Sequence, residues 1–179
     1  MNLAKLSAQL EGNNQHPPVE KWNPPFCGDM DIHIKADGQW LYMGSPIGRK
    51  PLVKLFASVL CMEGDEYFLK TPVEKVRISV EDAPFIITSW QQHQSEQGTI
   101  ISLQSNVDDN FVLGKDHQLL LPNEQQKGPL YVNIHRGMRA SVHRNVYYQL
   151  ADIAEIETIE GIDHFMIQSG REKFCIGAG

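Results

Sequence analysis

The pattern of apolar and polar positions predicts a β-hairpin over residues 31–43. The two kinds of side chain alternate on both sides of Asp37 and Gly38, which tolerate the positive φ angles of a two-residue turn. Such a turn sets the register of the strands and leaves Trp40 on the polar face of the hairpin. The predicted cross-strand pairs are Ile34 with Leu41, Ile32 with Met43 and His33 with Tyr42.

A second hairpin is predicted over residues 131–143, where the alternation returns around a three-residue loop, Arg136–Met138. Each hairpin therefore offers one apolar face to a core and one polar face to solvent. The predicted pairs in the second are Asn133 with Ser141 and Tyr131 with His143, and its apolar face carries Val132, Ile134, Ala140 and Val142.

Each hairpin is followed by apolar residues at helical spacing, in Leu52–Leu60 after the first and Asn145–Ile153 after the second. The first helix is expected to end at Gly64. A strand then follows each helix, at Tyr67–Leu69 and at Ile162–Ile167. The repeated order of strand, turn, strand, helix and strand, offset by about one hundred residues, indicates an internal duplication.

Further segments complete an α+β prediction of two related subdomains, each an antiparallel sheet or hairpin packed on a helix. Leucines at helical spacing predict a short helix near the N-terminus. Four strand candidates between the repeats indicate an antiparallel meander: Val76–Val80, Phe85–Trp90, Thr99–Leu103 and Phe111–Leu113. The expected divisions are residues 1–20 for the N-terminal helix and loop, 21–78 for an N-terminal unit, and 79–179 for a C-terminal unit with the larger antiparallel sheet.

Composition and charge narrow the classes of partner. With 179 residues, 41% of them hydrophobic, the chain can bury a substantial core. A net charge of -6 argues against general attraction to nucleic acid or to an anionic membrane. No apolar run approaches the roughly 20 residues of a membrane helix. The three cysteines form no CxxC pair and indicate a reducing compartment, so a cytoplasmic protein is expected.

Four potential metal ligands recur at every second position near the first hairpin: Cys27, Asp29, Asp31 and His33. Residues two apart on a strand are separated by about 6–7 Å, so the four cannot close around one ion. Gly28 also makes continuous strand geometry doubtful. The sequence therefore favours a solvated strand face here and assigns neither a metal nor another cofactor.

The polar face of the second hairpin is the one cationic concentration in this acidic sequence. Guanidinium and imidazole groups suit phosphate or carboxylate, and Arg144 precedes a helix whose free N–H groups also favour anions. Arg49 occupies the matching place before the first helix. The candidate ligand-binding residues are Tyr131, Asn133, His135, Arg139, Ser141, His143, Arg144 and Arg49, with Arg136 nearby.

Distinctive motifs occur in residues 22–32, 37–40, 44–49 and 71–75, and further motifs in 80–85 and 139–148. Together they resemble the bacterial domain-of-unknown-function family 1285 over nearly the whole chain from Trp22. The resemblance implies a two-part α+β fold with repeated motifs and a role in signal transduction. It supplies no catalytic residues.

These observations favour a non-enzymatic binding or regulatory protein. Its expected ligand is a small anionic molecule or an acidic protein segment, held by the face around Arg139 and Arg144 or between the two units. Two alternatives stay open: a metal-assisted or Cys/His hydrolase that uses Cys27, Asp29, Asp31 or His33, and a pure protein–protein adaptor. The sequence sets neither the ligand's identity nor the oligomeric state.

Overall fold

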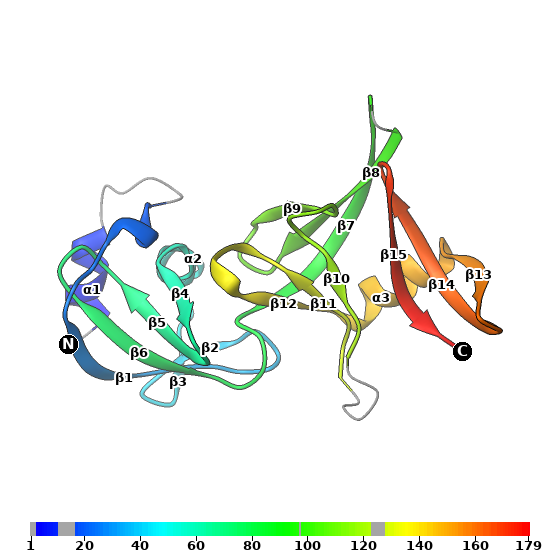
Figure 1. The fold of residues 1–179 in the computed structure, drawn as a ribbon. Helices are drawn as coiled ribbons and strands as arrows, with labels where there is room; N and C mark the ends of the chain where they lie inside the picture. Colours follow the sequence, from blue (N-terminus) through cyan, green and yellow to red (C-terminus); the bar gives the residue numbers. More distant parts are fainter. Residues whose placement is uncertain (1–2, 11–16, 97, 123–127) are drawn as a thin grey trace. The chain divides into compact units, whose positions relative to one another are not determined.

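The computed structural model describes residues 3–10, 17–96, 98–122 and 128–179 (Figure 1). The chain divides into two compact units. Unit 1 contains residues 1–84 together with Arg136–Met138, and unit 2 contains Phe85–His135 and Arg139–Gly179. Both units are built mainly from mixed β-sheets with few helices, so the protein is richer in sheet than the helix-packed α+β arrangement expected from its sequence.

Unit 1 contains a sheet with the strand order β3-β2-β1-β6-β5-β4. The central strands β1 and β6 run parallel, and their neighbours are antiparallel. Two helices, α1 and α2, accompany the sheet and contact each other. The elements are α1 (Leu3–Leu10), the 3-10 turn η1 (Val19–Lys21), β1 (Phe26–Ile34), β2 (Trp40–Tyr42), β3 (Ser45–Pro46), α2 (Lys50–Ser58), β4 (Leu60–Glu63), β5 (Glu66–Lys70) and β6 (Lys75–Val80).

The first hairpin, β1 to β2, differs by one residue from the register predicted by a two-residue turn. The N–H of Lys35 donates to the carbonyl of Gln39, and Gly38, at φ 80°, closes a three-residue loop. A slip of one residue turns every side chain of the returning strand to the opposite face. Trp40 is consequently buried at 2% exposure, whereas Met43 is 67% exposed. The observed pairs are Ile32 with Tyr42, His33 with Leu41 and Ile34 with Trp40.

The first repeat helix is shorter than predicted. The helix α2 begins after Arg49 with a proline in its first turn, a favoured position because the missing N–H has no partner there anyway. It ends at Ser58, and β4 turns into β5 through Gly64 and Asp65. The prediction that the helix continues to Gly64 was therefore wrong, because the apolar residues after Ser58 also satisfy the pattern of a strand. The N-terminal helix is confirmed, while residues 11–16 of the predicted loop lie outside the described residues.

Unit 2 contains one sheet with the order β10-β11-β12-β7-β8-β9 and another with the order β13-β14-β15. Strands β7, β8 and β9 form the predicted meander, but residues 75–80 belong to the sheet of unit 1. The elements are β7 (Phe85–Ser95), β8 (Gly98–Ser105), β9 (Asn110–Val112), β10 (Leu119–Leu120), β11 (Tyr131–Asn133), the turn η2 (His135–Gly137), β12 (Arg139–Val142), α3 (Arg144–Asp152), β13 (Glu155–Ile159), β14 (Ile162–Ser169) and β15 (Glu172–Ala178).

The predicted repeat is present in the order of elements. The hairpin β1–β2 leads through α2 to the strands β4, β5 and β6, and the hairpin β11–β12 leads through α3 to β13, β14 and β15. The pairing differs between the repeats. In unit 1 the last strand, β6, returns to lie parallel to β1, whereas in unit 2 the last three strands form a sheet of their own and β7 lies parallel to β12.

Each unit has its own apolar core. The alternating residues of the central strands are buried on one face, as the sequence pattern requires. Within the described residues, no helix has the length and apolar character needed to cross a bilayer. Fully buried side chains include Ile32, Ile34, Phe56, Leu60 and Leu69 in unit 1, and Phe85, Ile87, Ile101, Leu103 and Leu150 in unit 2.

Candidate functional site

The predicted cationic face lies in unit 2, on a hairpin whose loop is longer than expected. Asn133 pairs with Arg139 and Tyr131 with Ser141, so five residues rather than three connect β11 to β12. The chain turns through Arg136, which has a positive φ of 59°. Because the register differs by two positions, each side chain keeps its predicted face.

Arg139 stacks on the ring of Tyr131 within this hairpin. The guanidinium carbon lies 4.0 Å from the ring centroid, which is a favourable cation–π geometry. Tyr131 and Ser141 are both buried, so the prediction that this polar face is open to solvent was wrong at these two residues. The Ser141 hydroxyl donates to the carbonyl of Phe85 at 3.5 Å. Arg139 is therefore the exposed group of this pair of strands, with Tyr131 as its support.

Arg144 and Tyr148 form a second arginine–tyrosine pair on α3. Residues four apart share one helix face, and the Nε and Nη2 atoms of Arg144 donate to the Tyr148 hydroxyl at 3.1 and 3.0 Å. The side chain of Tyr148 is 50% exposed and its ring contacts that of Tyr147. His143 caps the helix, because its Nδ1 accepts from the N–H of Asn145 at 3.3 Å. The acceptor role fixes the ring proton on Nε2 when the imidazole is neutral.

Other predicted binding residues take part in separate contacts. The ring of His135 packs against the rings of Phe85 and Phe111, at centroid distances of 6.3 and 6.1 Å. Arg49 is exposed at the start of α2 and belongs to unit 1, whereas Arg139 belongs to unit 2. The structure thus places His135 in an aromatic contact and Arg49 in a different unit from the other predicted residues.

Arg136 has a structural role inside unit 1. Its guanidinium donates to the Glu20 carboxylate at 2.7 Å and to the carbonyls of Ser58, Leu60 and Pro17 at 2.7, 3.1 and 3.0 Å. Ser58 is the last residue of α2, so the cation satisfies carbonyls that the helix end leaves without internal partners. With a side chain only 10% exposed, Arg136 is committed to these contacts.

Two of the four potential metal ligands on β1, Asp29 and His33, are hydrogen-bonded to residues of β6 or to the residue that follows it. The Asp29 carboxylate accepts from Nε and Nη2 of Arg77 at 2.7 and 3.1 Å. The two ring nitrogens of His33 lie 3.0 Å from the Ser79 hydroxyl and 2.8 Å from a carboxylate oxygen of Glu81. Hydrogen bonds to Arg77 and to His33 hold the pKa values of Asp29 and Glu81 below their usual range. In the described parts of the chain, no three such side chains form a metal-binding group.

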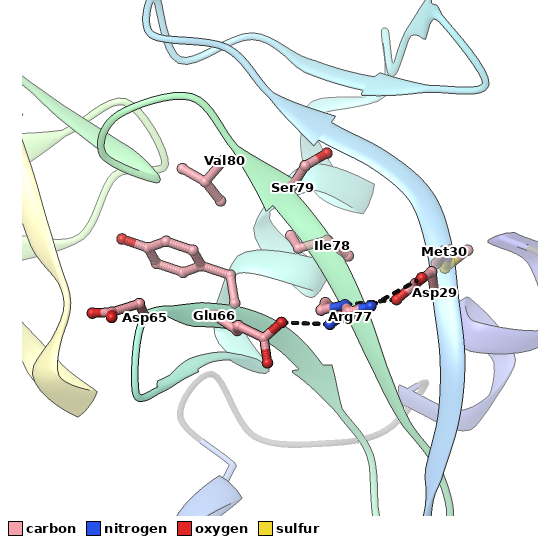
Figure 2. Close-up of a pocket in the computed structure, with 9 residues that line it drawn as sticks. Asp29, Met30, Asp65, Glu66, Arg77, Ile78, Ser79 and Val80 are labelled. Carbon is pink, nitrogen blue, oxygen red and sulfur yellow. Dashed lines mark hydrogen bonds and ion pairs between the residues drawn. The ribbon is translucent and has the colours of Figure 1, made fainter.

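A shallow pocket of about 480 Å³ lies over this charged sheet face (Figure 2). Figure 2 shows Arg77 between Asp29 and Glu66, while Asp65 is directed away from the guanidinium. The carboxylates of Asp29 and Glu66 raise the pKa of Arg77 further above its ordinary value. Since two carboxylates already balance the positive charge of Arg77, the pocket has no surplus positive charge to attract an anion.

Sequence reasoning missed two residues that shape these surfaces. Tyr148 supports Arg144, and the spacing of the two residues by four on a predicted helix could have revealed the pair. Arg77 lies on a segment correctly predicted as a strand, but its partners come from β1 and β5. The contact of Arg77 with β1 depends on the parallel pairing of β1 with β6, which no local sequence pattern predicts.

The fold and these surfaces can be compared with known proteins. Residues 17–83 match the description "Domain of unknown function (DUF1285), N-terminal domain", and residues 84–176 match "Protein of unknown function (DUF1285), C-terminal domain". A search of curated proteins finds no match.

Two solved structures are similar to this chain. The crystal structure of a DUF1285 family protein from Silicibacter pomeroyi DSS-3 is 34% identical, with a TM-score of 0.82, and the similarity covers 97% of this chain and 93% of that one. A DUF1285 family protein from Shewanella baltica OS155 is 29% identical, with a TM-score of 0.56, over 69% of this chain and 91% of that one. The chain therefore belongs to the DUF1285 family, as its motifs indicated.

Proposed function

We propose that this protein is a non-catalytic binding protein whose unit 2 recognises an acidic segment of a partner protein. The recognition surface consists of the two arginine–tyrosine pairs and the helix cap between them. We call it the Arg–Tyr surface: Tyr131, Arg139, His143, Arg144 and Tyr148. Such a protein fits the regulatory role that the sequence motifs imply.

The observation that carries this proposal is the set of contacts that the Arg144 guanidinium makes. Its guanidinium is hydrogen-bonded to the Tyr148 hydroxyl, and within the described residues no carboxylate is paired with it. Arg77, by contrast, is paired with Asp29 and Glu66. An arginine steadied by a tyrosine loses little side-chain freedom on binding, and both residue types are enriched at the energetic centres of interfaces.

The spacing of the two arginines favours an extended partner over a small anion. Arg139 opens β12 and Arg144 follows its end, and five residues of strand span about 16 Å. This separation of the two backbone positions favours a ligand that is longer than one phosphate or carboxylate group. A run of about five extended residues with acidic side chains can contact both.

Binding of a fluorescent peptide of about ten residues, in which glutamate alternates with alanine, tests this proposal. The Arg139→Glu, Arg144→Glu double variant is expected to weaken binding by about tenfold or more, because it reverses both charges. Arg171→Glu is the control for one such charge reversal, since Arg171 lies at an exposed turn of the same unit, and it should leave affinity near that of wild type.

Two further readouts separate the possible outcomes. Added salt should weaken the interaction, because exposed charges are screened. Inorganic phosphate should compete poorly if the ligand must span both arginines. Equal affinity of the double variant and the Arg171→Glu control would contradict the proposal.

The hydrolase alternative gains no support from the geometry of β1. Asp29 is occupied by Arg77, and His33 lies between Ser79 and Glu81. A histidine positioned by a carboxylate also needs a nucleophile to form a catalytic group. The Ser79 hydroxyl lies 3.0 Å from a ring nitrogen of His33, but it also donates to the carbonyl of Ile32 at 3.3 Å and so takes part in the contacts within the sheet. This arrangement joins the central strands of the sheet.

A further inference from the structure

Exposed isoleucines concentrate in one short stretch of unit 2. Among the described residues, eleven large hydrophobic side chains are exposed, and four of them fall within residues 153–162. Their exposed fractions range from 40 to 62%. Single exposed apolar residues are common, but a cluster of this kind marks a surface that binds another molecule. The four are Ile153, Ile156, Ile159 and Ile162.

These isoleucines flank or belong to β13, which is an edge strand. The sheet has the order β13-β14-β15, so among the described residues β13 is paired on one side only (Figure 1). Every second residue of an edge strand directs its N–H and C=O groups away from the sheet. A partner strand can therefore hydrogen-bond to this side of β13 without breaking any existing pair.

The rest of this sheet is anchored within unit 2. Ile167 and Phe174 are buried. The Ser169 hydroxyl donates to the carbonyl of Leu113 at 2.9 Å and accepts from the N–H of Ile101 at 3.0 Å. The start of β13 pairs with Met166, next to this anchored part of β14, so an incoming strand would add to an edge that is already held at one end.

The charge around β13 distinguishes between possible occupants. Asp152, Glu155 and Glu160 are exposed beside the isoleucines, and Glu157 is paired with Lys173. Antiparallel pairing with β13 of a second copy would place glutamates opposite each other when the pair is centred on Ile156 or Glu157, which is unfavourable. A strand that carries lysine or arginine would instead match this edge in charge.

We infer that β13 accepts an extended, basic and apolar segment of a partner protein as an additional strand of its sheet. This inference goes beyond the proposed function, because it concerns a different surface with the opposite charge preference. The backbone pairs supply the attachment, and the side chains of the incoming strand supply the specificity. Apolar side chains contact Ile156 on one face of the sheet, and basic side chains lie beside Glu155 and Glu157 on the other, since successive residues of a strand point to opposite faces.

Titration of the isotope-labelled protein with a peptide of about eight residues, alternating lysine and valine, tests the inference by amide chemical shifts. The shifts are expected to concentrate at Glu155–Ile159, and the β13 amides that face away from β14 should become protected from hydrogen exchange. Ile156→Lys should weaken binding by about tenfold, because it places a cation against the basic peptide. Val112→Lys is the matched control, since Val112 is another exposed apolar residue on an edge strand, β9.

Three results would overturn the inference. These are the absence of binding at millimolar peptide, shifts confined to other elements, and equal affinity of the two lysine variants. A concentration-dependent dimer in analytical ultracentrifugation that Ile156→Lys abolishes would assign the edge to a second copy instead. The Arg144→Glu variant should bind the lysine–valine peptide as wild type does, so failure of the Arg–Tyr surface proposal is distinguishable from failure here.

Discussion

The observed register of the first hairpin and the register of a two-residue turn make opposite predictions for the burial of two adjacent residues. In the structure Trp40 is buried and Leu41 is only half-buried, whereas a two-residue turn would bury Leu41 and expose Trp40. Removing a large aromatic side chain from a packed core costs about 3–5 kcal/mol, so Trp40→Ala should lower the free energy of unfolding by that amount. Leu41→Ala should cost about 1 kcal/mol, because less apolar surface is lost from the core.

A conservative substitution at the same position isolates the polar part of the tryptophan. Within the described residues the buried indole N–H of Trp40 has no hydrogen-bond acceptor. A buried donor without a partner costs about 1–3 kcal/mol. Trp40→Phe removes that donor but also some apolar contact, so the two effects offset each other and stability should change by less than about 1 kcal/mol.

Urea unfolding followed by the amide resonances of unit 1 measures these differences, because a chain of two units need not unfold in one step. A loss of about 4 kcal/mol should lower the midpoint of unit 1 by about 2 M. The register would be refuted if Leu41→Ala destabilised unit 1 more than Trp40→Ala does. A loss of several kcal/mol in Trp40→Phe would show that the indole N–H is hydrogen-bonded.

Three further predictions concern single side chains. Arg136→Met keeps the aliphatic stem but leaves carbonyls at the end of α2 without their donor. The free energy of unfolding of unit 1, measured in urea, should therefore fall by about 2–4 kcal/mol. An unchanged midpoint would contradict the role of this arginine as a cap. Two lysines hold the pKa of the Glu63 carboxyl below its usual 4.5. The charged carboxylate therefore stabilises the folded protein above that pH, and this stabilisation is lost as the pH falls through the folded-state pKa. The melting temperatures of wild type and Glu63→Gln should therefore differ at neutral pH and converge in acid, whereas a constant difference would rule out the linkage. Burial raises the pKa of the Cys61 thiol and shields it from solvent. A thiol reagent should therefore label the exposed Cys27 in the folded protein and Cys61 only after unfolding. Labelling of Cys61 in the folded protein would argue against its burial.

Local patterns predicted which elements exist better than how they pair. Alternation located both hairpins, and helical spacing located α3. The first register was missed because Asp37 and Gly38 suit a three-residue loop with a left-handed glycine as well as a two-residue turn. Only the burial of Trp40 against the core decides between the two, and that information is not local.

The surfaces proposed to bind partners were predictable in part. The pattern located Arg139 and Arg144, and the helical spacing of Arg144 and Tyr148 could have revealed their pairing, but no local pattern shows that Arg139 stacks on Tyr131. The strand β13 was missed, although its alternation of glutamate with isoleucine or threonine before Gly161 is a usable hairpin signal. Its exposure as an edge depends on the separate sheet of unit 2, which the sequence repeat did not predict.

The parallel pairs at the centre of each main sheet have a consequence for how the chain folds. Asp29 lies beside Arg77, 48 positions later, and Ser141 lies beside Phe85 at a separation of 56. Closing a loop of about 50 residues costs roughly 3 kcal/mol of chain entropy before these contacts reward it. A nascent chain leaving the ribosome can therefore form its hairpins early, yet neither sheet is complete until the distant partner strand has been synthesised. Folding of each unit is expected to be limited by this late pairing rather than by its turns.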